Sequence, residues 1–324
     1  MNKDLKNIVK TIKKANRIAL FTHISPDCDA LGSVFGLYYA LKTLNKTVSI
    51  FCKDEFTEVE KLLFEEEYIN HDDCNKDDYD LFISCDSPAT FRLGAYEEVF
   101  KDKDNTIVLD HHFNSGLIGK YNYIDIERSS CCEIVYSLLK ALKIKITPTI
   151  ANKLYTGLST DTGSFINSNA NVNSFQVALE LAKHGAETSK LNEILYRTQT
   201  KKEIRFKKYL WTNFKIEDDC AYCLLTNKDL LKLKGQKSDS NNYSSSLISI
   251  QGVNYSFSIV EEKEGLYSVS MRSKLGFDVR SKAELLGGGG HICAAGAKIE
   301  CESMEDAFMR VMKAIKGNEW NLTE

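Results

Sequence analysis

Histidine and aspartate residues recur in this sequence directly after short apolar runs that are typical of buried β-strands. Four separate segments carry them: His23, Asp27 and Asp29 in the first, Asp86 in the second, Asp110, His111 and His112 in the third, and Asp161 in the fourth. In open α/β sheets, ligands collect beyond the carboxyl ends of parallel strands, so these segments are predicted to converge on one site. Carboxylate oxygens mixed with imidazole nitrogens are typical ligands of divalent metal ions.

The number of carboxylates favours two metal ions over one. Hard oxygen ligands mixed with imidazole suit Mn²⁺ best, and Mg²⁺ or Co²⁺ could replace it. Two ions about 3.5–4 Å apart can activate water and stabilise the attacking and leaving oxygens of an in-line displacement at phosphorus. The predicted reaction is therefore hydrolysis of a phosphoester. Nucleotide-driven and acyl-enzyme mechanisms lack support, because the sequence has neither a Gly-x4-Gly-Lys-Ser/Thr loop nor a Gly-x-Ser-x-Gly elbow.

Helix capping is the competing explanation for these aspartates. An aspartate that follows a strand often caps the next helix, and a helical pattern does begin at residues 30–33. For any single aspartate, capping explains the sequence as well as metal binding does. Capping does not explain why three histidines accompany five aspartates at four segment ends, so the set as a whole favours a metal centre.

A glycine-rich segment near the C-terminus predicts a second kind of binding site. Residues 287–290 are all glycine and lead into His291, which is too glycine-dense for a regular element to be expected. Successive backbone N–H groups there could bind an anion, and His291 could donate to a phosphate or stack on a base. A flexible hinge is the alternative. Arg272 and Ser273, which end a preceding strand-like run, could clamp a phosphate.

Alternating strand-like and helical patterns indicate how these residues are positioned. Up to about residue 161 the strand-like runs are separated by helical patterns, which predicts a parallel α/β sheet; the runs are 18–22, 47–52, 81–85 and 106–109. Helical patterns then dominate from 174 to 211. Strands return at 220–225, 255–260 and 267–272, and helices follow at 279–286 and 303–315. The Ser- and Asn-rich segment 237–246 is expected to be a loop.

Length and composition fit a two-domain protein that acts on small substrates. The chain has 324 residues, about twice the length expected of one domain, so an α/β domain followed by a smaller α+β domain is predicted. A net charge of -3 gives no general attraction to long nucleic acid but allows a short anionic substrate. No run approaches the roughly 18 apolar residues of a membrane span. Ten cysteines without a regular framework fit reduced thiols and a cytoplasmic location.

The ordered motifs resemble those of DHH-family phosphoesterases that carry a DHH-associated C-terminal domain. They are His23-Ile-Ser-Pro-Asp27-Cys-Asp29, Asp86, Asp110-His111-His112, Thr160-Asp161-Thr162-Gly163 and Gly287-Gly-Gly-Gly-His291. Within that family the chain is similar to the bacterial nanoRNases. The resemblance implies a manganese-dependent enzyme that cleaves short oligoribonucleotides such as pApA to mononucleotides and dephosphorylates 3'-phosphoadenosine 5'-phosphate. A cyclic di-AMP phosphodiesterase is the alternative, and a nucleotide-binding regulator without turnover is a third hypothesis.

The resemblance also implies a role for each motif residue. The first Mn²⁺ would be held by His23 and Asp27, the second by Asp29, His111 and Asp161, and both would be bridged by Asp86. Asp110 would orient a histidine, and His112 would stabilise the charge on the scissile phosphate. Substrate would be bound by Arg272, Ser273, Gly288, Gly289, Gly290 and His291.

The domain boundaries expected from this resemblance place the active site in an interdomain cleft. They are 1–185 for the DHH domain, 186–214 for a helical linker, and 215–324 for the DHH-associated substrate-binding domain. Short RNA oligonucleotides or dinucleotides would be the binding partners, with no membrane involved. The resemblance weakly favours a homodimer.

Overall fold

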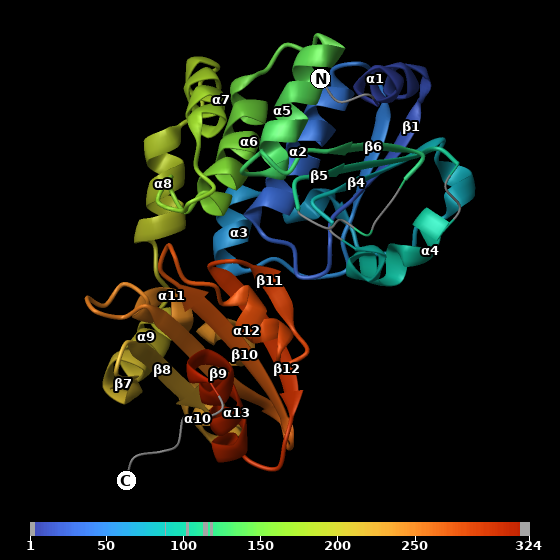
Figure 1. Cartoon of the computed structure of the whole chain (residues 1–324). Helices are drawn as coiled ribbons and strands as arrows, with labels where there is room; N and C mark the ends of the chain where they lie inside the picture. The colour runs from blue at the N-terminus through green and yellow to red at the C-terminus, as the bar shows by residue number, and fades with distance from the viewer. Residues whose placement is uncertain (1–3, 88, 102–103, 113–115, 117–118, 318–324) are drawn as a thin grey trace. The chain divides into compact units, whose positions relative to one another are not determined.

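The computed structural model describes residues 4–87, 89–101, 104–112, 116 and 119–317. The chain divides into two compact units, Met1–Thr198 and Gln199–Glu324 (Figure 1). Each unit is built around its own six-stranded sheet. Among the described residues, no helix is long and apolar enough to cross a membrane.

The first unit contains a fully parallel sheet with the strand order β3-β2-β1-β4-β5-β6. Its strands are β1 (Arg17–Phe21), β2 (Thr47–Phe51), β3 (Ile69–Asn70), β4 (Leu81–Cys85), β5 (Thr106–Asp110) and β6 (Tyr121–Ile124). Every residue of β4 and β5 is buried, as expected of central strands that are covered on both faces. The predicted parallel α/β sheet is therefore confirmed, and β3 and β6 add two short edge strands.

Helices cover both faces of this sheet. They are α1 (Leu5–Lys14), α2 (Cys28–Lys42), α3 (Glu58–Leu63), α4 (Glu97–Lys101), α5 (Cys131–Leu142), α6 (Pro148–Asp161), α7 (Val172–Lys183) and α8 (Thr188–Arg197), with 3₁₀ turns η1 (Glu66–Tyr68), η2 (Lys76–Asp78) and η3 (Thr90–Tyr96). One face packs against α1, α2, α5 and α6 through a large aliphatic core. The other face has an aromatic cluster in which the rings of Phe21 and Phe51 stack at 5.3 Å.

The close packing of α2 against α6 depends on glycine. A Cβ atom on Gly32 would lie 2.6 Å from the backbone oxygen of Lys153, and one on Gly157 would lie 2.8 Å from the Cα of Asp29. Such contacts exclude any side chain at these positions. The result is that the start of α2, which carries Asp29, lies directly against the last turn of α6, which ends at Asp161.

The second unit contains a mixed sheet with the strand order β11-β12-β10-β9-β8-β7. Its strands are β7 (Lys215–Glu217), β8 (Cys220–Leu225), β9 (Tyr255–Lys263), β10 (Leu266–Ser273), β11 (Gly289–His291) and β12 (Ala294–Glu300). Its helices are α9 (Lys201–Asn213), α10 (Asn227–Leu233), α11 (Tyr243–Leu247), α12 (Arg280–Glu284) and α13 (Met304–Lys316), with the 3₁₀ turn η4 (Lys237–Ser240). Among the described strands of this unit, only β8 and β9 pair in parallel. A smaller second sheet unit is therefore confirmed.

Two local predictions in this unit were wrong. The expected loop at 237–246 contains η4 and the start of α11, because Tyr243 is buried and donates from its hydroxyl to the backbone oxygen of Phe206 at 2.7 Å. The glycine run was expected to be irregular, yet Gly289 to His291 form β11. Strand β12 opposes it with the small residues Ala294 to Gly296, so the two backbones can pair closely. Tertiary packing determined the secondary structure of both segments.

Candidate metal centre

The four predicted segments converge at the carboxyl edge of the parallel sheet. His23 follows β1, Asp86 follows β4, and the Asp110-His111-His112 motif follows or ends β5. These three strands are neighbours, since β1 pairs with β4 and β4 pairs with β5. The close packing of α2 and α6 brings the remaining aspartates to the same edge.

The side chains form two groups of potential ligands that share one carboxylate. In the first group, the Nε2 atom of His23 lies 3.9 Å from Oδ2 of Asp27 and 3.8 Å from Oδ2 of Asp86. In the second, the Nε2 atom of His111 lies 3.8 Å from Asp29 Oδ2 and 3.5 Å from Asp161 Oδ2. The other oxygen of Asp86, Oδ1, lies 3.4 Å from the same His111 nitrogen. Asp86 thus presents one oxygen to each group.

The backbone holds both histidines with Nε2 directed into the cluster. Nδ1 of His111 lies 3.2 Å from the backbone oxygen of Arg128, and Nδ1 of His23 lies 2.9 Å from the backbone oxygen of Ile24. Nδ1 of His23 also lies 2.9 Å from Nη2 of Arg92, which can only donate, so its two contacts favour opposite tautomers. A carbonyl only accepts hydrogen bonds, so Nδ1 of His111 carries the proton and its Nε2 has a free lone pair. This is the tautomer that a metal ion requires.

Burial and mutual repulsion make the carboxylates of the cluster costly to ionise without cations. Burial, followed by the nearby Asp29 carboxylate, raises the pKa of Asp86 and of Asp161 well above the ordinary value. Burial also raises the pKa of Asp29. Among the residues that the structure describes, Oδ1 of Asp86 has no hydrogen-bond partner. Buried carboxylates in this condition are stabilised by positive charge.

The backbone at Asp86 adds conformational strain at the centre of the cluster. Its φ angle is +59°, in the left-handed region that residues other than glycine and asparagine or aspartate seldom occupy. Strained backbone of this kind concentrates at functional sites. The donor set and the shared, unsatisfied carboxylate fit divalent metal ions. Ligand atoms that could hold a metal ion lie close together in three overlapping groups, which are His23, Asp27 and Asp86; Asp29, His111 and Asp161; and Asp86, His111 and His112.

Asp110 and His112 occupy a different position from the predicted ligands. Asp110 is completely buried, and its Oδ1 lies 2.8 Å from Nδ1 of His112. The same oxygen accepts from the backbone N–H groups of His111 and His112. Asp110 therefore fixes the backbone of His111 and His112 and the ring of His112. The His112 ring remains partly accessible, with Nδ1 3.5 Å from Oδ1 of Asp86.

Several residues that support the cluster were not predicted from the sequence. The backbone N–H groups of Cys131 and Cys132, at the start of α5, donate to the two oxygens of Asp29 at 2.6 and 3.0 Å. Nδ2 of Asn169 donates to the backbone oxygens of both Asp161 and Ser129. Arg92 places Nη2 2.9 Å from Nδ1 of His23. None of these contacts has a local sequence signal apart from the serine N-cap that starts α5 at Ser130.

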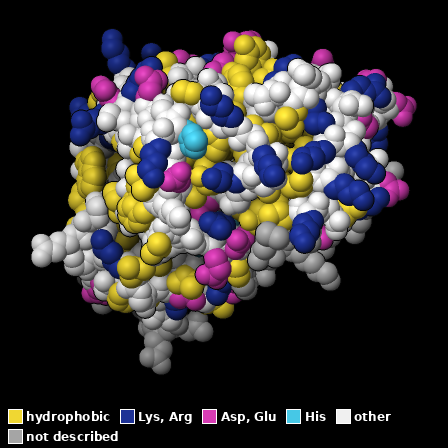
Figure 2. Space-filling view, turned by 90° about the horizontal axis from the view of Figure 1, so that it is seen from above, with side chains coloured by type: hydrophobic (Ala, Val, Ile, Leu, Met, Phe, Trp, Pro, Cys, Tyr) yellow, Lys and Arg dark blue, Asp and Glu magenta, His cyan; other side chains and the backbone are white. Residues whose placement is uncertain are grey.

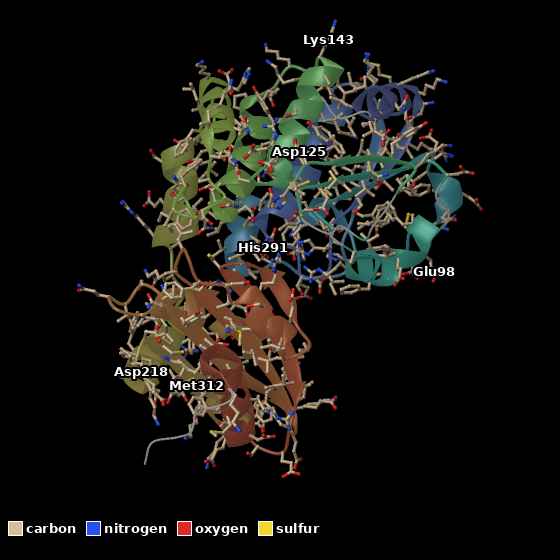
Figure 3. The ribbon with its side chains drawn as sticks, viewed as in Figure 1. Glu98, Asp125, Lys143, Asp218, His291 and Met312 are labelled. Atoms are coloured by element: carbon tan, nitrogen blue, oxygen red, sulfur yellow. The ribbon has the colours of Figure 1, made fainter. Side chains whose placement is uncertain are left out.

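The predicted substrate residues of the second unit lie around β10, β11 and the turn before β11. His291 is exposed (Figure 3), and a Cβ atom on Gly289 would meet nothing within 4 Å. Burial lowers the pKa of Arg272, whose Nη1 donates to the backbone oxygen of Met271. The hydroxyl of Ser273 donates to the backbone oxygen of Phe277 at 2.8 Å, so it already has a structural partner.

The glycines before His291 have two different roles. Gly288 is packed against β12, where an added Cβ would lie 2.1 Å from the backbone oxygen of Gly296. Gly290 has a φ of +144° and is equally confined, with the oxygen of Ala294 2.6 Å from its would-be Cβ. These two glycines let the hairpin close, whereas Gly289 leaves its surface open to a ligand.

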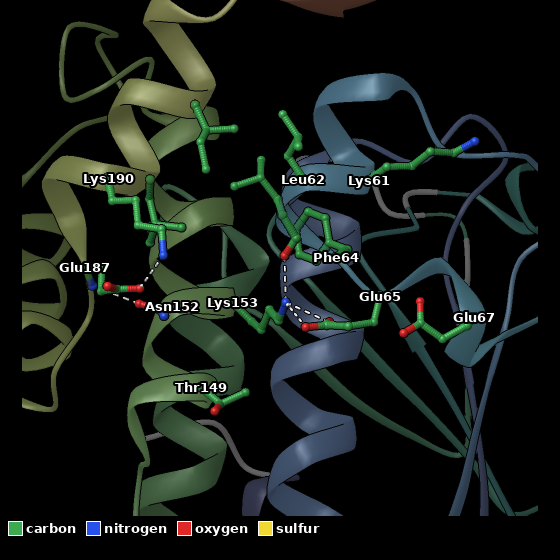
Figure 4. Close-up of a pocket in the computed structure, with 13 residues that line it drawn as sticks. Lys61, Leu62, Phe64, Glu65, Glu67, Thr149, Asn152, Lys153, Glu187 and Lys190 are labelled. Carbon is green, nitrogen blue, oxygen red and sulfur yellow. Dashed lines mark hydrogen bonds and ion pairs between the residues drawn. The ribbon is translucent and has the colours of Figure 1, made fainter.

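A cavity of about 440 Å³ lies elsewhere in the first unit, between α3, α6 and α8 (Figure 4). No member of the aspartate and histidine cluster lines it. Its wall includes the buried Lys153, whose Nζ lies 2.6 Å from the backbone oxygen of Leu63 and within 2.9 Å of both carboxylate oxygens of Glu65. This lysine is fully engaged and has no evident chemical task.

Comparison with known proteins finds similarity along most of the chain. Residues 17–158 match the DHH family, N-terminal domain, and residues 222–317 match the DHHA1 domain. A bifunctional oligoribonuclease and PAP phosphatase NrnA of Thermus thermophilus is 30% identical over 303 residues, which cover 92% of this chain and 89% of that protein.

Solved structures extend the similarity to the fold. An exopolyphosphatase-related protein from Bacteroides fragilis superposes with a TM-score of 0.88 and 26% identity, covering 97% of this chain and 95% of that one. RecJ of Thermus thermophilus in complex with Mn²⁺ has a TM-score of 0.57 and 18% identity, covering 97% of this chain and 55% of that one. The second likeness concerns the fold alone.

Proposed function

Because the chain belongs to the DHH family of phosphoesterases, we propose that it cleaves short oligoribonucleotides, including pApA, to mononucleotides and dephosphorylates 3'-phosphoadenosine 5'-phosphate. As a member of this family it is a hydrolase acting on phosphoester bonds. The single observation that carries the proposal is the pair of ligand groups that share Asp86. The name of the Thermus thermophilus relative supports the choice of substrates.

Two Mn²⁺ ions are the proposed cofactors, with Mg²⁺ or Co²⁺ as substitutes. When bound, divalent ions would polarise the phosphoryl oxygens and lower the pKa of coordinated water. His23 and Asp27 would hold one ion, while Asp29, His111 and Asp161 would hold the other, and Asp86 would bridge them. The raised pKa values of Asp29, Asp86 and Asp161 support this assignment, since cations would relieve their repulsion.

The remaining residues of the cluster would orient the reactants. Asp110 would keep the Nδ1 proton of His112 directed toward itself, as their 2.8 Å separation indicates. Nε2 of His112 would then face the scissile phosphate, and with the ring protonated on both nitrogens it would donate a hydrogen bond to the phosphate and stabilise the charge that develops in the transition state. Arg92, beside His23, is a further candidate for contact with a phosphate oxygen.

We assign the substrate-binding role to the second unit. The proposed domain limits are 1–185 for the phosphoesterase domain, 186–214 for the helical linker and 215–324 for the substrate-binding domain. The exposed ring of His291 and the open backbone at Gly289 would contact the terminal nucleotide, with Arg272 near its phosphate. Ser273 would act through the backbone, because its hydroxyl is already bonded.

The test is a Mn²⁺-dependent time course with four substrates side by side: pApA, a five-nucleotide RNA, cyclic di-AMP and 3'-phosphoadenosine 5'-phosphate. The matched control is Asp86→Asn, because asparagine keeps the shape of the side chain and tolerates the left-handed backbone. Rapid cleavage of the linear substrates and dephosphorylation of the fourth, both lost in the variant, would support the proposal.

Other results would change the assignment in defined ways. Cleavage of cyclic di-AMP at a rate comparable to pApA would make the protein a cyclic dinucleotide phosphodiesterase. Nucleotide binding without Mn²⁺-stimulated hydrolysis of any of the four would replace the enzyme by a binding protein.

A further inference from the structure

Helix α9 in the second unit presents a basic surface that its own packing leaves open. Five of its thirteen residues are lysine or arginine, and only Glu203 is acidic. Phe206 and Leu210 form its buried side, which packs against β8 and α10 (Figure 1). The opposite side carries exposed residues that follow one another at intervals of three or four positions and therefore share one face of the helix. We call them the α9 face: Lys201, Ile204, Arg205, Lys208, Trp211 and Thr212.

Arg205 connects the α9 face to the end of α10. Its Nε atom donates to the backbone oxygen of Leu233, the last residue of α10, at 3.3 Å. Leu233 stands between Lys232 and Lys234, which are both exposed. Two further positive charges therefore lie beside Arg205, and the basic surface continues from one helix onto the next.

The acidic residues of the same elements do not neutralise this surface. Glu203 and Asp229 each accept from the backbone N–H of the residue that caps the start of their own helix. Asp239 of η4 forms an ion pair with Lys202 at 2.7 Å. No other lysine of α9 forms an ion pair with a described residue. The charges of the α9 face are therefore available to an anionic partner.

An exposed aromatic ring accompanies these charges. Trp211 is 46% exposed, and its ring meets the ring of Phe214 in a T-shaped contact with the centroids 5.6 Å apart. Lys208 precedes Trp211 by three positions, so a cation and an indole are neighbours on the surface of the helix. Proteins that bind single-stranded nucleic acid combine these two components, because cations follow the phosphates and aromatic rings stack on the bases.

Helix α1 is a second lysine-rich helix, and it lacks the aromatic component. Lysine and arginine side chains are numerous on the face drawn in Figure 2, so exposed positive charge is not confined to α9. The exposed lysines of α1 are Lys6, Lys10, Lys13 and Lys14, and the helix contains no aromatic residue. Its charges attract anions in general, whereas the α9 face also offers a stacking partner to a base.

We propose that the α9 face is a binding site for single-stranded RNA, which holds the part of a longer strand that is not being cleaved. The identity of the polyanion rests on the proposed function. An anionic membrane is a poorer partner, because Ile204 and Trp211 are the only apolar side chains of the α9 face and a membrane-bound helix buries a broad apolar side.

The α9 face is separate from the predicted substrate residues of the second unit. It belongs to a helix that packs on β8, whereas Gly289 and His291 lie on β11. These strands are four positions apart in the sheet, which is about 19 Å at about 4.8 Å per strand. A stacked single strand advances by about 3.4 Å per nucleotide, so about six nucleotides are needed to reach from one site to the other.

Fluorescence anisotropy of the full chain with a labelled, unstructured RNA of about twelve nucleotides tests the proposal. EDTA is present so that no strand is cleaved, and we expect a Kd of about 1–100 µM at physiological salt. Lys208→Glu should weaken binding at least about tenfold and reduce the slope of log Kd against log salt by about one. The control is Lys10→Glu on α1, which should leave the Kd unchanged within about twofold.

Trp211 tests the stacking component separately. Trp211→Ala should weaken binding at least about fivefold without changing the salt slope, and Trp211→Phe should retain most of the affinity. Trp320 is the other tryptophan of the sequence, so Trp320→Phe leaves Trp211 as the only reporter of intrinsic fluorescence. RNA should quench that fluorescence. Circular dichroism of each variant checks that the fold is retained.

Several results would overturn the proposal. One is an RNA affinity that is the same in Lys208→Glu and Trp211→Ala as in the original chain. Another is a chain that has no affinity for the RNA but binds vesicles of anionic lipid through Lys208. The proposed function fails in a different way: a chain that binds RNA through the α9 face without hydrolysing pApA would keep this site and lose that function. Hydrolysis of pApA by a chain whose RNA affinity does not depend on the α9 face would be the reverse result.

Discussion

The metal centre and the Lys153–Glu65 contact bury charge in the same α/β unit in opposite ways. At the contact, the Lys153 ammonium meets both carboxylate oxygens of Glu65, a backbone carbonyl, and the faces of the Phe35 and Phe64 rings. In the metal centre, carboxylate lies beside carboxylate, and burial raises the pKa of three of them. At the Lys153–Glu65 contact, opposite charges within the chain compensate each other. In the metal centre, the carboxylates face one another without such compensation.

This difference separates a structural use of buried charge from a functional one. A buried ion pair that is complete within the chain contributes to stability through packing and hydrogen bonds, and removing one partner is costly. A buried set of like charges destabilises the chain by itself and becomes favourable only when a cation or proton is added. Burial alone would not have distinguished the two regions, since both contain side chains that are almost inaccessible.

The largest expected effect is that of Asp86→Asn. Hydrolysis of pApA should fall at least a thousandfold, or about 4 kcal/mol in activation free energy, because the carboxylate shared by the two ligand groups is lost. Without metal, the free energy of unfolding in urea should be about 1–2 kcal/mol higher for the variant than for the original protein, because one buried repelling charge is gone. Asp77→Ala, an exposed aspartate on η2, is the control. A metal-free variant less stable than the original would contradict the inference that the buried carboxylates of the metal centre destabilise the chain when no cation is present.

Lys153→Ala should have the opposite effects to Asp86→Asn, lowering stability while leaving turnover unchanged. The free energy of unfolding should fall by about 3 kcal/mol, because Glu65 and the Leu63 carbonyl lose their partner and the aromatic rings lose a packed side chain. The turnover of the folded fraction should not change. Lys61→Ala, which removes an exposed pair with Glu66, should cost less than about 1 kcal/mol. Equal losses for the two lysines in urea denaturation would show that burial of the pair is unimportant.

Asp110→Asn sharpens the comparison, because Asp110 is a buried carboxylate of the metal centre that already has partners. It accepts from two backbone N–H groups and lies against Nδ1 of His112. Turnover should fall about 10–100-fold, as expected when a group that orients a functional histidine is altered. Mn²⁺ binding measured by calorimetry should weaken far less than in Asp86→Asn. Equal loss of Mn²⁺ affinity in both variants would place Asp110 among the ligands instead.

Stability should depend on pH differently with and without metal. Because the folded-state pKa values of Asp29, Asp86 and Asp161 are raised, the folded apo protein retains protons that the unfolded chain releases. Its stability should therefore decrease as pH rises above the ordinary aspartate pKa of about 4. The stabilisation by Mn²⁺ should increase over the same range, by at most about 1.4 kcal/mol per pH unit for each proton displaced. Thermal melts at several pH values, with and without Mn²⁺, measure both slopes, and a metal effect that does not vary with pH would be the contrary result.

Much of the metal centre could be predicted from the sequence, because its residues stand next to local signals. An apolar run followed by aspartate or histidine indicates a strand end, and parallel strands bring such ends to one edge. The structure does bring His23, Asp86 and His111 together at that edge. Their individual roles in metal binding stay predictions. The edge strands β3 and β6 were missed because they are short and partly polar.

The sequence by itself therefore determined the chemical character of the site, the parallel sheet that carries it and the family to which the chain belongs. Only the tertiary structure decided how Asp86 divides its two oxygens between the ligand groups, since that depends on a left-handed backbone and on strands β1 and β5. It also decided that the glycine run forms β11 and that α7 leaves an apolar stripe exposed. Periodicity records which residues prefer burial, whereas contacts between distant segments determine which of them are covered.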